Sequence, residues 1–370
     1  MPPAPIIANV ASGAESGIGE SEVFAAGLLE GRVALVTGGG TGLGMASAIE
    51  LARCGARVAV VGRREEPLRE AVAEIGRERA SWARGDVRDR AQARALVAGA
   101  LERWGRLDVL VNNAGGQYFT PAEGIAAKGW GAVWRLNVDG MLNMAEEAFT
   151  QTVGAGGEGS TGSAGLEGGS AASDGESGGT DGQSEETEGE GGRTDEESGR
   201  TDGECRTGSA RMRRAGSAGG AHRAGEGLRI VNVTLSPHHG MPGMAHSGAA
   251  RAAVEALTGE LARRWAGAGA TVCAVAAGHF DTEAMAKYPD VVRAGMARSV
   301  PMQRLGTVQE HAWLIALLAS PLGGVLNGST VTLDGARDNW FGPWPPPGLA
   351  DSAGEVPVEE RRGTRGRTAG

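Results

Sequence analysis

Hydrophobic residues in this chain form short apolar runs that alternate with stretches of helical periodicity. The apolar runs predict strands at 32–36, 58–61, 81–83, 107–111, 229–234, 270–275 and 329–333. The periodic stretches predict helices at 45–54, 67–75, 91–104, 131–150, 249–265 and 312–318. Alternation of this kind predicts a parallel sheet with helices on both faces. We therefore expect an α/β fold, a Rossmann-type doubly wound parallel sheet.

The pattern also predicts how the chain is divided. We expect a flexible leader at 1–23, one domain at 24–345 and a tail at 346–370. The domain is interrupted at 154–226, where seven arginines and fifteen acidic residues lie among Gly, Ser, Thr and Ala. So few apolar residues cannot offset the entropy of ordering, which predicts a disordered insert. Alternatively, this acidic stretch binds a basic partner.

Charge and cysteine content narrow the class of protein. The insert carries almost all of the formal net charge of −9, so the remainder is close to neutral, which argues against a nucleic-acid surface. The three cysteines show neither metal-binding nor redox spacing, and no metal site is expected. No signal peptide, membrane span or C-terminal peroxisomal signal is visible, which predicts a cytoplasmic protein.

A glycine-rich turn at 37–44 follows the first predicted strand and opens a helix. Its sequence is TGGGTGLG, and a similar glycine spacing at 13–19 lies too close to the first strand to leave room for a helix between them. Glycines allow a backbone to approach a pyrophosphate, and a helix N-terminus offers N–H groups to an anion. The predicted cofactor-binding residues of this turn are Gly38, Gly40, Thr41, Gly42, Leu43 and Gly44.

The end of the second predicted strand indicates which dinucleotide is bound. An acidic residue at this position would hold a ribose 2′-hydroxyl and repel a 2′-phosphate. This chain has Arg63 and Arg64 instead. A guanidinium matches phosphate geometry, so the pattern favours NADP(H) with Arg63 at the phosphate; the alternative is a solvated surface arginine.

Further motifs, in order along the chain, resemble those of the short-chain dehydrogenases/reductases. They include Asp86-Val87, Asn112-Asn113-Ala114-Gly115, Asn137, the segment from Gly278 to Thr282, Arg304-Leu305-Gly306 and Leu333-Asp334-Gly335. The resemblance covers most of the chain outside its ends and the insert, although Ala277 replaces the family's proline before Gly278. It implies that Asp86, Val87, Asn113, Ala114, Gly115, Gly278 and Thr282 contact the cofactor. It also implies a homo-oligomer, dimer or tetramer.

Segments that vary within this family narrow the resemblance. Residues 26–31, 115–123, 128–130 and 246–252 look like those of the peroxisomal trans-2-enoyl-CoA reductases, with the 2,4-dienoyl-CoA reductases as the neighbouring branch. This implies NADPH-dependent reduction of an α,β-unsaturated acyl thioester, carried by CoA or by acyl carrier protein. No membrane or nucleic-acid partner is expected.

The position of the family's Tyr-x-x-x-Lys pair is occupied by Ser247 and Arg251. The two tyrosines of the chain, Tyr118 and Tyr288, have no lysine four residues later. A ketone reductase needs an acid to protonate the developing alkoxide, and a serine is too weak an acid for that task. Reduction of an enoyl thioester instead places charge on an enolate oxygen, which needs only oriented donors.

We therefore expect Thr234, Ser247 and Arg251 to stabilise charge, with Asn137 as the family's helix asparagine. Thr234 lies thirteen residues before Ser247. Alternatively, Thr234 and Ser247 cap secondary structure, and Arg251 pairs with Glu255. The donor of the proton that Cα gains stays open among Tyr118, water and the histidines at 238, 239 and 246.

Two other functions remain compatible with the residues. One is a carbonyl reductase with an atypical acid, for which Tyr288 and His246 are candidates. The other is a non-catalytic NADPH-binding protein. The insert follows the helix that contains Asn137 and precedes the strand that begins near Arg229. We expect it to leave the domain at the edge of the sheet opposite the cofactor.

Overall fold

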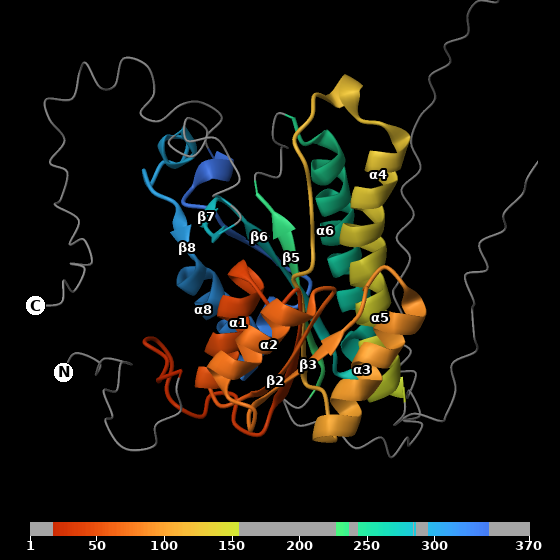
Figure 1. The fold of residues 1–370 in the computed structure, drawn as a ribbon, viewed down its shortest axis with the longest axis vertical. Coiled ribbons are helices and arrows are strands. Elements are labelled where there is room, and N and C mark those ends of the chain that lie inside the picture. Colours follow the sequence, from red (N-terminus) through yellow and green to blue (C-terminus); the bar gives the residue numbers. More distant parts are fainter. Residues whose placement is uncertain (1–17, 155–226, 237–242, 284, 286–294, 340–370) are drawn as a thin grey trace, which may run out of the picture. The chain divides into compact units, whose positions relative to one another are not determined.

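The computed structural model describes residues 18–154, 227–236, 243–283, 285 and 295–339 (Figure 1). The strands are β1 (Val33–Thr37), β2 (Arg57–Gly62), β3 (Ala80–Arg84), β4 (Val109–Asn112), β5 (Arg229–Leu235), β6 (Thr271–Ala277), β7 (Phe280–Asp281), β8 (Gly306–Thr307) and β9 (Thr330–Leu333). The α-helices are α1 (Gly42–Arg53), α2 (Glu65–Ile75), α3 (Arg90–Trp104), α4 (Ala127–Trp134), α5 (Gly140–Thr152), α6 (Ala245–Trp265) and α8 (Val308–Ala319).

One parallel sheet organises these elements. Its strand order is β3-β2-β1-β4-β5-β6-β9, and every pairing within it is parallel. The chain moves outward from β1 to β3 and then returns to β4 on the other side of β1. Ligands of doubly wound sheets bind at such a reversal, beyond the carboxyl ends of the strands. The predicted fold class is confirmed.

Alternating strand residues build a core on each face of the sheet. Ala34 and Val36 of β1 pack with residues of α1, α2 and α8, whereas Val33 and Leu35 pack with residues of α3, α5 and α6. Successive side chains of a strand point to opposite faces, so each apolar strand is covered on both sides. Figure 1 shows the same two layers of helices. The layers hold the carboxyl ends of the strands in a fixed arrangement.

The helix predicted at 131–150 is present, and a π-helical turn interrupts its α-helical hydrogen bonding. Helix α4 ends at Trp134, a π-helical turn spans Arg135–Asp139, and α5 begins at Gly140. The turn contains Asn137, which is 2% exposed. Its side-chain Nδ2 donates to the Val133 carbonyl oxygen at 2.8 Å and to the Gly116 carbonyl oxygen at 2.9 Å. The bond to the loop after β4 is a tertiary interaction, so periodicity alone does not predict the break.

Several predicted segments fall wholly or partly outside the described residues. These are most of the leader, nearly all of the insert at 154–226, and the tail. The described end of the leader contacts α1: the Ile18 carbonyl accepts from Arg53 Nε at 2.7 Å, and Ser21 donates to Glu50. Within the described part of the chain, no helix is both long and apolar enough to cross a membrane.

Candidate active site

The glycine-rich turn joins β1 to α1 at the reversal of the sheet. Gly38 has a positive φ of 65°, a conformation that glycine adopts without strain. Helix α1 begins at Gly42, has no acidic residue in its first turn, and its N-cap Thr41 makes no side-chain capping bond. Leu43 and Gly44 lie in that same first turn. The free N–H groups at this helix start suit a bound anion.

Residues after β4 hold the turn in place. The Asn113 amide Nδ2 donates to the Thr37 carbonyl at 3.0 Å and to the Gly38 carbonyl at 3.4 Å. In return, the backbone N–H groups of Asn113 and Ala114 donate to Thr37 Oγ1, at 3.0 and 2.9 Å. Asn113 therefore shapes the turn through its side chain, and its contact with a cofactor remains a prediction.

A cavity of about 510 Å³ lies above the ends of the first four strands. Its lining includes the predicted residues Gly38, Gly40, Thr41, Arg63, Arg64, Asp86, Val87, Asn113, Ala114 and Gly115. It also includes Gly62, Pro67, Leu68, Gly85 and Leu136, which the sequence motifs did not single out. Gly62, Pro67, Leu68 and Gly85 lie within three residues of another lining residue, whereas Leu136 lies in the π-helical turn next to Asn137. Their places beside the motifs are the signal that could have found them.

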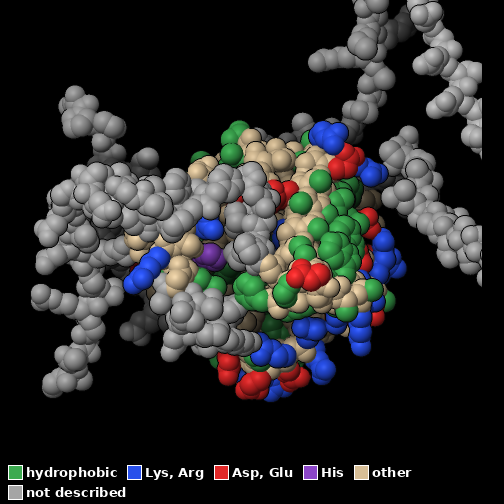
Figure 2. Space-filling model, turned by 90° about the horizontal axis from the view of Figure 1, so that it is seen from above, with side chains coloured by type: hydrophobic (Ala, Val, Ile, Leu, Met, Phe, Trp, Pro, Cys, Tyr) green, Lys and Arg blue, Asp and Glu red, His purple; other side chains and the backbone are tan. Residues whose placement is uncertain are grey.

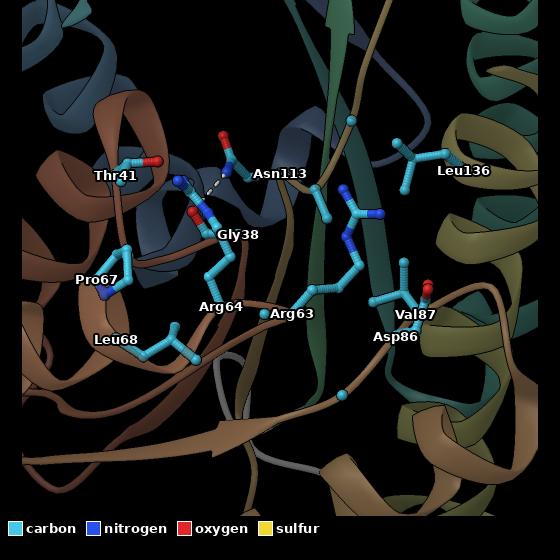
Figure 3. A pocket seen from close by; sticks show the side chains of 15 residues that line it. Gly38, Thr41, Arg63, Arg64, Pro67, Leu68, Asp86, Val87, Asn113 and Leu136 are labelled. Carbon is cyan, nitrogen blue, oxygen red and sulfur yellow. Dashed lines mark hydrogen bonds between the residues drawn. The ribbon is translucent and has the colours of Figure 1, made fainter. Parts of the chain in front are cut away.

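Two cations enter this cavity from the end of β2. Figure 3 shows the Arg64 side chain extending toward Gly38 and Thr41, and the Arg63 side chain extending toward Leu136. Both arginines are exposed. On the opposite side, Asp86 is paired with Arg88, whose Nε lies 2.9 and 3.0 Å from the two carboxylate oxygens. This hydrogen-bonded pairing lowers the pKa of Asp86 below its ordinary value.

The residues of the cavity fit a dinucleotide. A helix start without acidic residues faces two arginines across a space lined by glycine backbone, while Val87, Leu68 and Leu136 supply apolar surface. Pyrophosphate and phosphate groups suit the first set, and an adenine ring suits the second. The described residues contain no cluster of His, Cys, Asp and Glu that could hold a metal ion.

Arg251 lies next to the loop that borders this cavity. Its Nη1 donates to the Val233 carbonyl of β5 at 2.7 Å, and its Nη2 would lie 2.5 Å from a Cβ added at Gly115. Arg251 Nε is buried without a hydrogen-bond partner among the described residues. Burial lowers the pKa of Arg251 to about 10. The guanidinium is directed at β5 and Gly115, whereas the predicted alternative partner Glu255 accepts a bond from Thr234.

Ser247 lies one helical turn before Arg251 on α6 and is fully buried. Its hydroxyl donates to Gln117 Oε1 at 3.2 Å. The helix begins at Ala245 with Met244 as its N-cap, so Ser247 does not cap it. Thr234, 3% exposed, directs its hydroxyl to α6, where the Arg251 carbonyl and Glu255 Oε1 each lie 3.3 Å away. Thr234 is therefore bonded to α6 and is not among the residues that line the cavity.

The last two predicted contacts lie beyond the cavity. Gly278 follows β6 and packs against Asp334, and Thr282 follows β7. Neither lines the cavity within the described residues, and residues 286–294, which follow Thr282, lie outside them. Tyr288, one of the candidate acids, lies in that undescribed segment. His238 and His239 lie in another undescribed segment, residues 237–242. Roles for these residues stay predictions.

Comparison with known families gives two matches, one on each side of residues 164–206. Residues 32–163 match the family described as short chain dehydrogenase, and residues 207–336 match the family described as enoyl-(acyl carrier protein) reductase. Among curated proteins, a probable 2,4-dienoyl-CoA reductase of Bacillus subtilis is 27% identical over 86% of this chain and 100% of its own length. A peroxisomal 2,4-dienoyl-CoA reductase of Arabidopsis thaliana is 34% identical over 34% of this chain and 43% of its own length.

Solved structures show the same architecture. A citronellol catabolism dehydrogenase of Pseudomonas aeruginosa has 30% sequence identity and a TM-score of 0.59, and the match covers 85% of this chain and 98% of that one. A short chain dehydrogenase of Bacillus anthracis has 25% identity and a TM-score of 0.60, with 85% and 100% covered. Each of these two solved structures therefore matches 85% of this chain.

Proposed function

We propose that this protein reduces the 2,3 double bond of a trans-2-enoyl thioester with NADPH. The chain belongs to the short-chain dehydrogenase family, whose members are oxidoreductases that use nicotinamide cofactors. The acyl group is carried by CoA or by acyl carrier protein. Two similar proteins are 2,4-dienoyl-CoA reductases by name, which supports this class of substrate.

The observation that carries the proposal is the pair Ser247 and Arg251, of which Arg251 approaches Gly115 at the edge of the cavity. A ketone reductase needs a proton donor of suitable acidity at this point, and a buried serine hydroxyl does not provide one. Arg251 keeps its proton even with a pKa lowered to about 10. Both side chains nevertheless donate hydrogen bonds, and donors are what an enolate oxygen requires.

The chemistry divides between the cofactor and the protein. Bound NADPH would supply a hydride to Cβ of the acyl chain. Ser247 and Arg251 would stabilise the negative charge that then forms on the thioester oxygen. The Ser247 hydroxyl donates to the neutral Gln117 amide, which an anionic oxygen can replace as the better acceptor. The unpartnered Nε of Arg251 is a second donor in the same region.

An apolar surface for the acyl chain lies next to these donors. Tyr118, Phe119 and Trp130 are exposed by 38%, 45% and 41%. Figure 2 looks down on the molecule from above the view of Figure 1 and shows hydrophobic side chains gathered over the side that carries α4 and α6. Exposed apolar patches on soluble proteins often mark binding sites. This apolar surface suits the acyl chain of the proposed substrate.

The cofactor preference rests on Arg63 and Arg64. Replacing either arginine with alanine should weaken NADPH binding by about 10- to 100-fold, because a hydrogen bond to a charged group is worth roughly 1.5–3 kcal/mol. NADH binding should change little, since NADH lacks the 2′-phosphate. Arg69→Ala is the control, because Arg69 pairs with Glu65 on the exposed face of α2. Equal losses for NADPH and NADH would contradict the proposed phosphate contact.

The deciding experiment is oxidation of NADPH by the full-length protein with crotonyl-CoA and with longer trans-2-enoyl-CoA substrates. Turnover is expected, and both Ser247→Ala and Arg251→Ala should lower kcat by about 100-fold or more, the loss found when one oxyanion donor is removed. NADPH binding without enoyl turnover at any chain length would overturn the proposal. Faster turnover of ketones would favour a carbonyl reductase instead.

A further inference from the structure

His246 is a buried titratable residue for which the reaction outlined above has no role. Its side chain is 1% exposed, and neither ring nitrogen has a hydrogen-bond partner among the described residues. A buried polar group without a partner costs about 1–3 kcal/mol. Nothing on the described protein offsets this cost, so the ring is suited to a partner that arrives with a ligand.

The surroundings of His246 place it on the acyl side of the site. Its ring lies against the Tyr118 ring, with 4.3 Å between the ring centroids. The next residue on α6 is Ser247, which is bonded to Gln117. Two residues after Tyr118, the Thr120 N–H donates to the Gly243 carbonyl at 2.9 Å.

Segments 117–120 and 243–247 therefore form one continuous contact. It extends from Gly115 and Gly116, which the Arg251 and Asn137 side chains approach, to the exposed apolar surface around Phe119. A thioester whose oxygen reaches Ser247 and whose chain lies on that surface would lie along this contact. His246 is part of the contact, one residue before the proposed oxyanion donor Ser247.

We propose that His246 is the catalytic acid that delivers the proton gained at Cα of the acyl substrate. The inference rests on the proposed function. Bound NADPH would supply the hydride at Cβ, and the electrons of the double bond would become the enolate. The enolate then forms a C–H bond at Cα with the proton of the imidazolium, whose N–H electrons stay on nitrogen. Solvent returns the proton to the neutral ring.

The acidity of the ring is appropriate to this step. Burial lowers the pKa of His246 below its ordinary value of 6.5, so the protonated form is a somewhat stronger acid than a free imidazolium. An enolate beside the ring favours the protonated form while charge develops.

The first test does not require turnover. The imidazole resonances of the full-length protein, saturated with NADP⁺, are recorded by NMR as crotonyl-CoA is added; the oxidised cofactor has no hydride to give. His246→Gln and His311→Gln variants identify the two signals. The His246 signal should shift, and the His311 signal should not, because His311 is buried between α1 and α8. Binding of crotonyl-CoA without a shift of His246 overturns the inference and leaves the proposed function intact.

The second test follows where the proton is added. With deuterated NADPH in D₂O, crotonyl-CoA gains one deuterium at Cβ and one at Cα, and NMR of the product reports their relative configuration. Wild-type protein should give one configuration. His246→Gln should lower kcat by about 100-fold and give both configurations, since solvent then reaches either face of the enolate. His311→Gln should match the wild type.

The outcomes separate the two ideas. Retained rate and configuration in His246→Gln would remove His246 from the reaction while the enoyl reductase activity stands. Absence of both crotonyl-CoA binding and turnover in the wild-type protein would overturn the proposed function, and the inference with it.

Discussion

Gly115 lies where Arg251 of α6 and Asn137 of the π-helical turn approach the loop after β4. A Cβ at this position would lie 2.5 Å from Arg251 Nη2 and 2.9 Å from Asn137 Oδ1. The Arg251 and Asn137 side chains thus both approach the position that a Cβ of residue 115 would occupy. The space between them exists only because the residue is glycine.

Gly115→Ala should therefore weaken NADPH binding by about tenfold or more, because forced overpacking typically costs roughly 1–3 kcal/mol. Gly131→Ala is the matched control, since a Cβ there meets nothing within 4 Å and the residue lies inside α4. The control should bind NADPH normally and unfold at equal or higher urea concentration. Normal NADPH affinity in Gly115→Ala would show that Arg251 and Asn137 move aside freely.

Individual site residues could be predicted only as far as their positions in motifs. The glycine turn, Arg63 and Asp86 lie around one cavity, as the order of strands and turns indicates. The direction of the Thr234 hydroxyl was not predictable, because it depends on how α6 packs across β5. The same holds for Ser247, whose partner Gln117 lies 130 residues away in sequence.

At the scale of elements, α8 links local sequence signals to stability. Thr307 and Glu310 form a reciprocal capping box at its start, and Glu310 also pairs with Arg304. His311, the next residue, is fully buried, with Ser47 Oγ of α1 at 3.4 Å from its Nδ1. The two titratable residues respond to acid in different pH ranges, which allows their contributions to be separated.

His311 should destabilise the fold as the pH falls below about 6.5. Burial lowers its pKa from 6.5 to about 4. The unfolded chain then binds a proton that the folded chain excludes, so the free energy of unfolding falls progressively between pH 6.5 and 4. Urea unfolding at a series of pH values should show this slope, and His311→Gln should flatten it. An unchanged slope in the variant would assign the acid sensitivity to other groups.

Glu310 should act at lower pH. Hydrogen bonds from Arg304 lower its pKa from 4.5 to about 2. A lowered carboxyl pKa stabilises the folded state above pH 4.5, and this contribution is lost as the pH falls from 4.5 toward 2. Glu310→Gln should unfold more easily at pH 7 but lose less stability across that range. If wild type and variant lose stability in parallel below pH 4.5, the Arg304 pairing contributes nothing.

The elements themselves were largely predictable, with informative exceptions. Apolar runs and helical periodicity located each strand of the main sheet within a few residues. The π-helical turn at Asn137 was not predicted, and the bond from its side chain to the loop after β4 is a contact that periodicity does not report. Strands β7 and β8 contain two residues each and pair only with one another, so no periodic pattern reports them. Strand order was likewise not predicted, since alternation indicates only that the sheet is parallel.

At the scale of the whole molecule, the acidic insert and the cofactor cavity are connected by α5. This helix begins at Gly140, next to the turn in which Asn137 binds Gly116. Its thirteen residues extend about 20 Å at 1.5 Å per residue. After it, Gly154 is the last described residue, and the chain is described again from Gly227, just before β5. Because Arg229 begins β5, this junction lies at the amino edge of the sheet, and the cavity lies at the carboxyl edge.

Deletion of residues 156–225 should therefore leave NADPH affinity and turnover of crotonyl-CoA within about twofold of the full-length protein. The remaining connection from Thr152 to Arg229 contains six residues, a common length between a helix and a strand. The deletion also removes most of the net negative charge, so the variant should elute from an anion-exchange column at much lower salt.

NADPH affinity is measured by fluorescence titration and turnover by the loss of NADPH absorbance. A large loss of either, in a variant that unfolds at the same urea concentration as the full-length protein, would mean that the acidic segment acts on the cofactor or the substrate. Unchanged values would assign the catalytic properties to the rest of the chain.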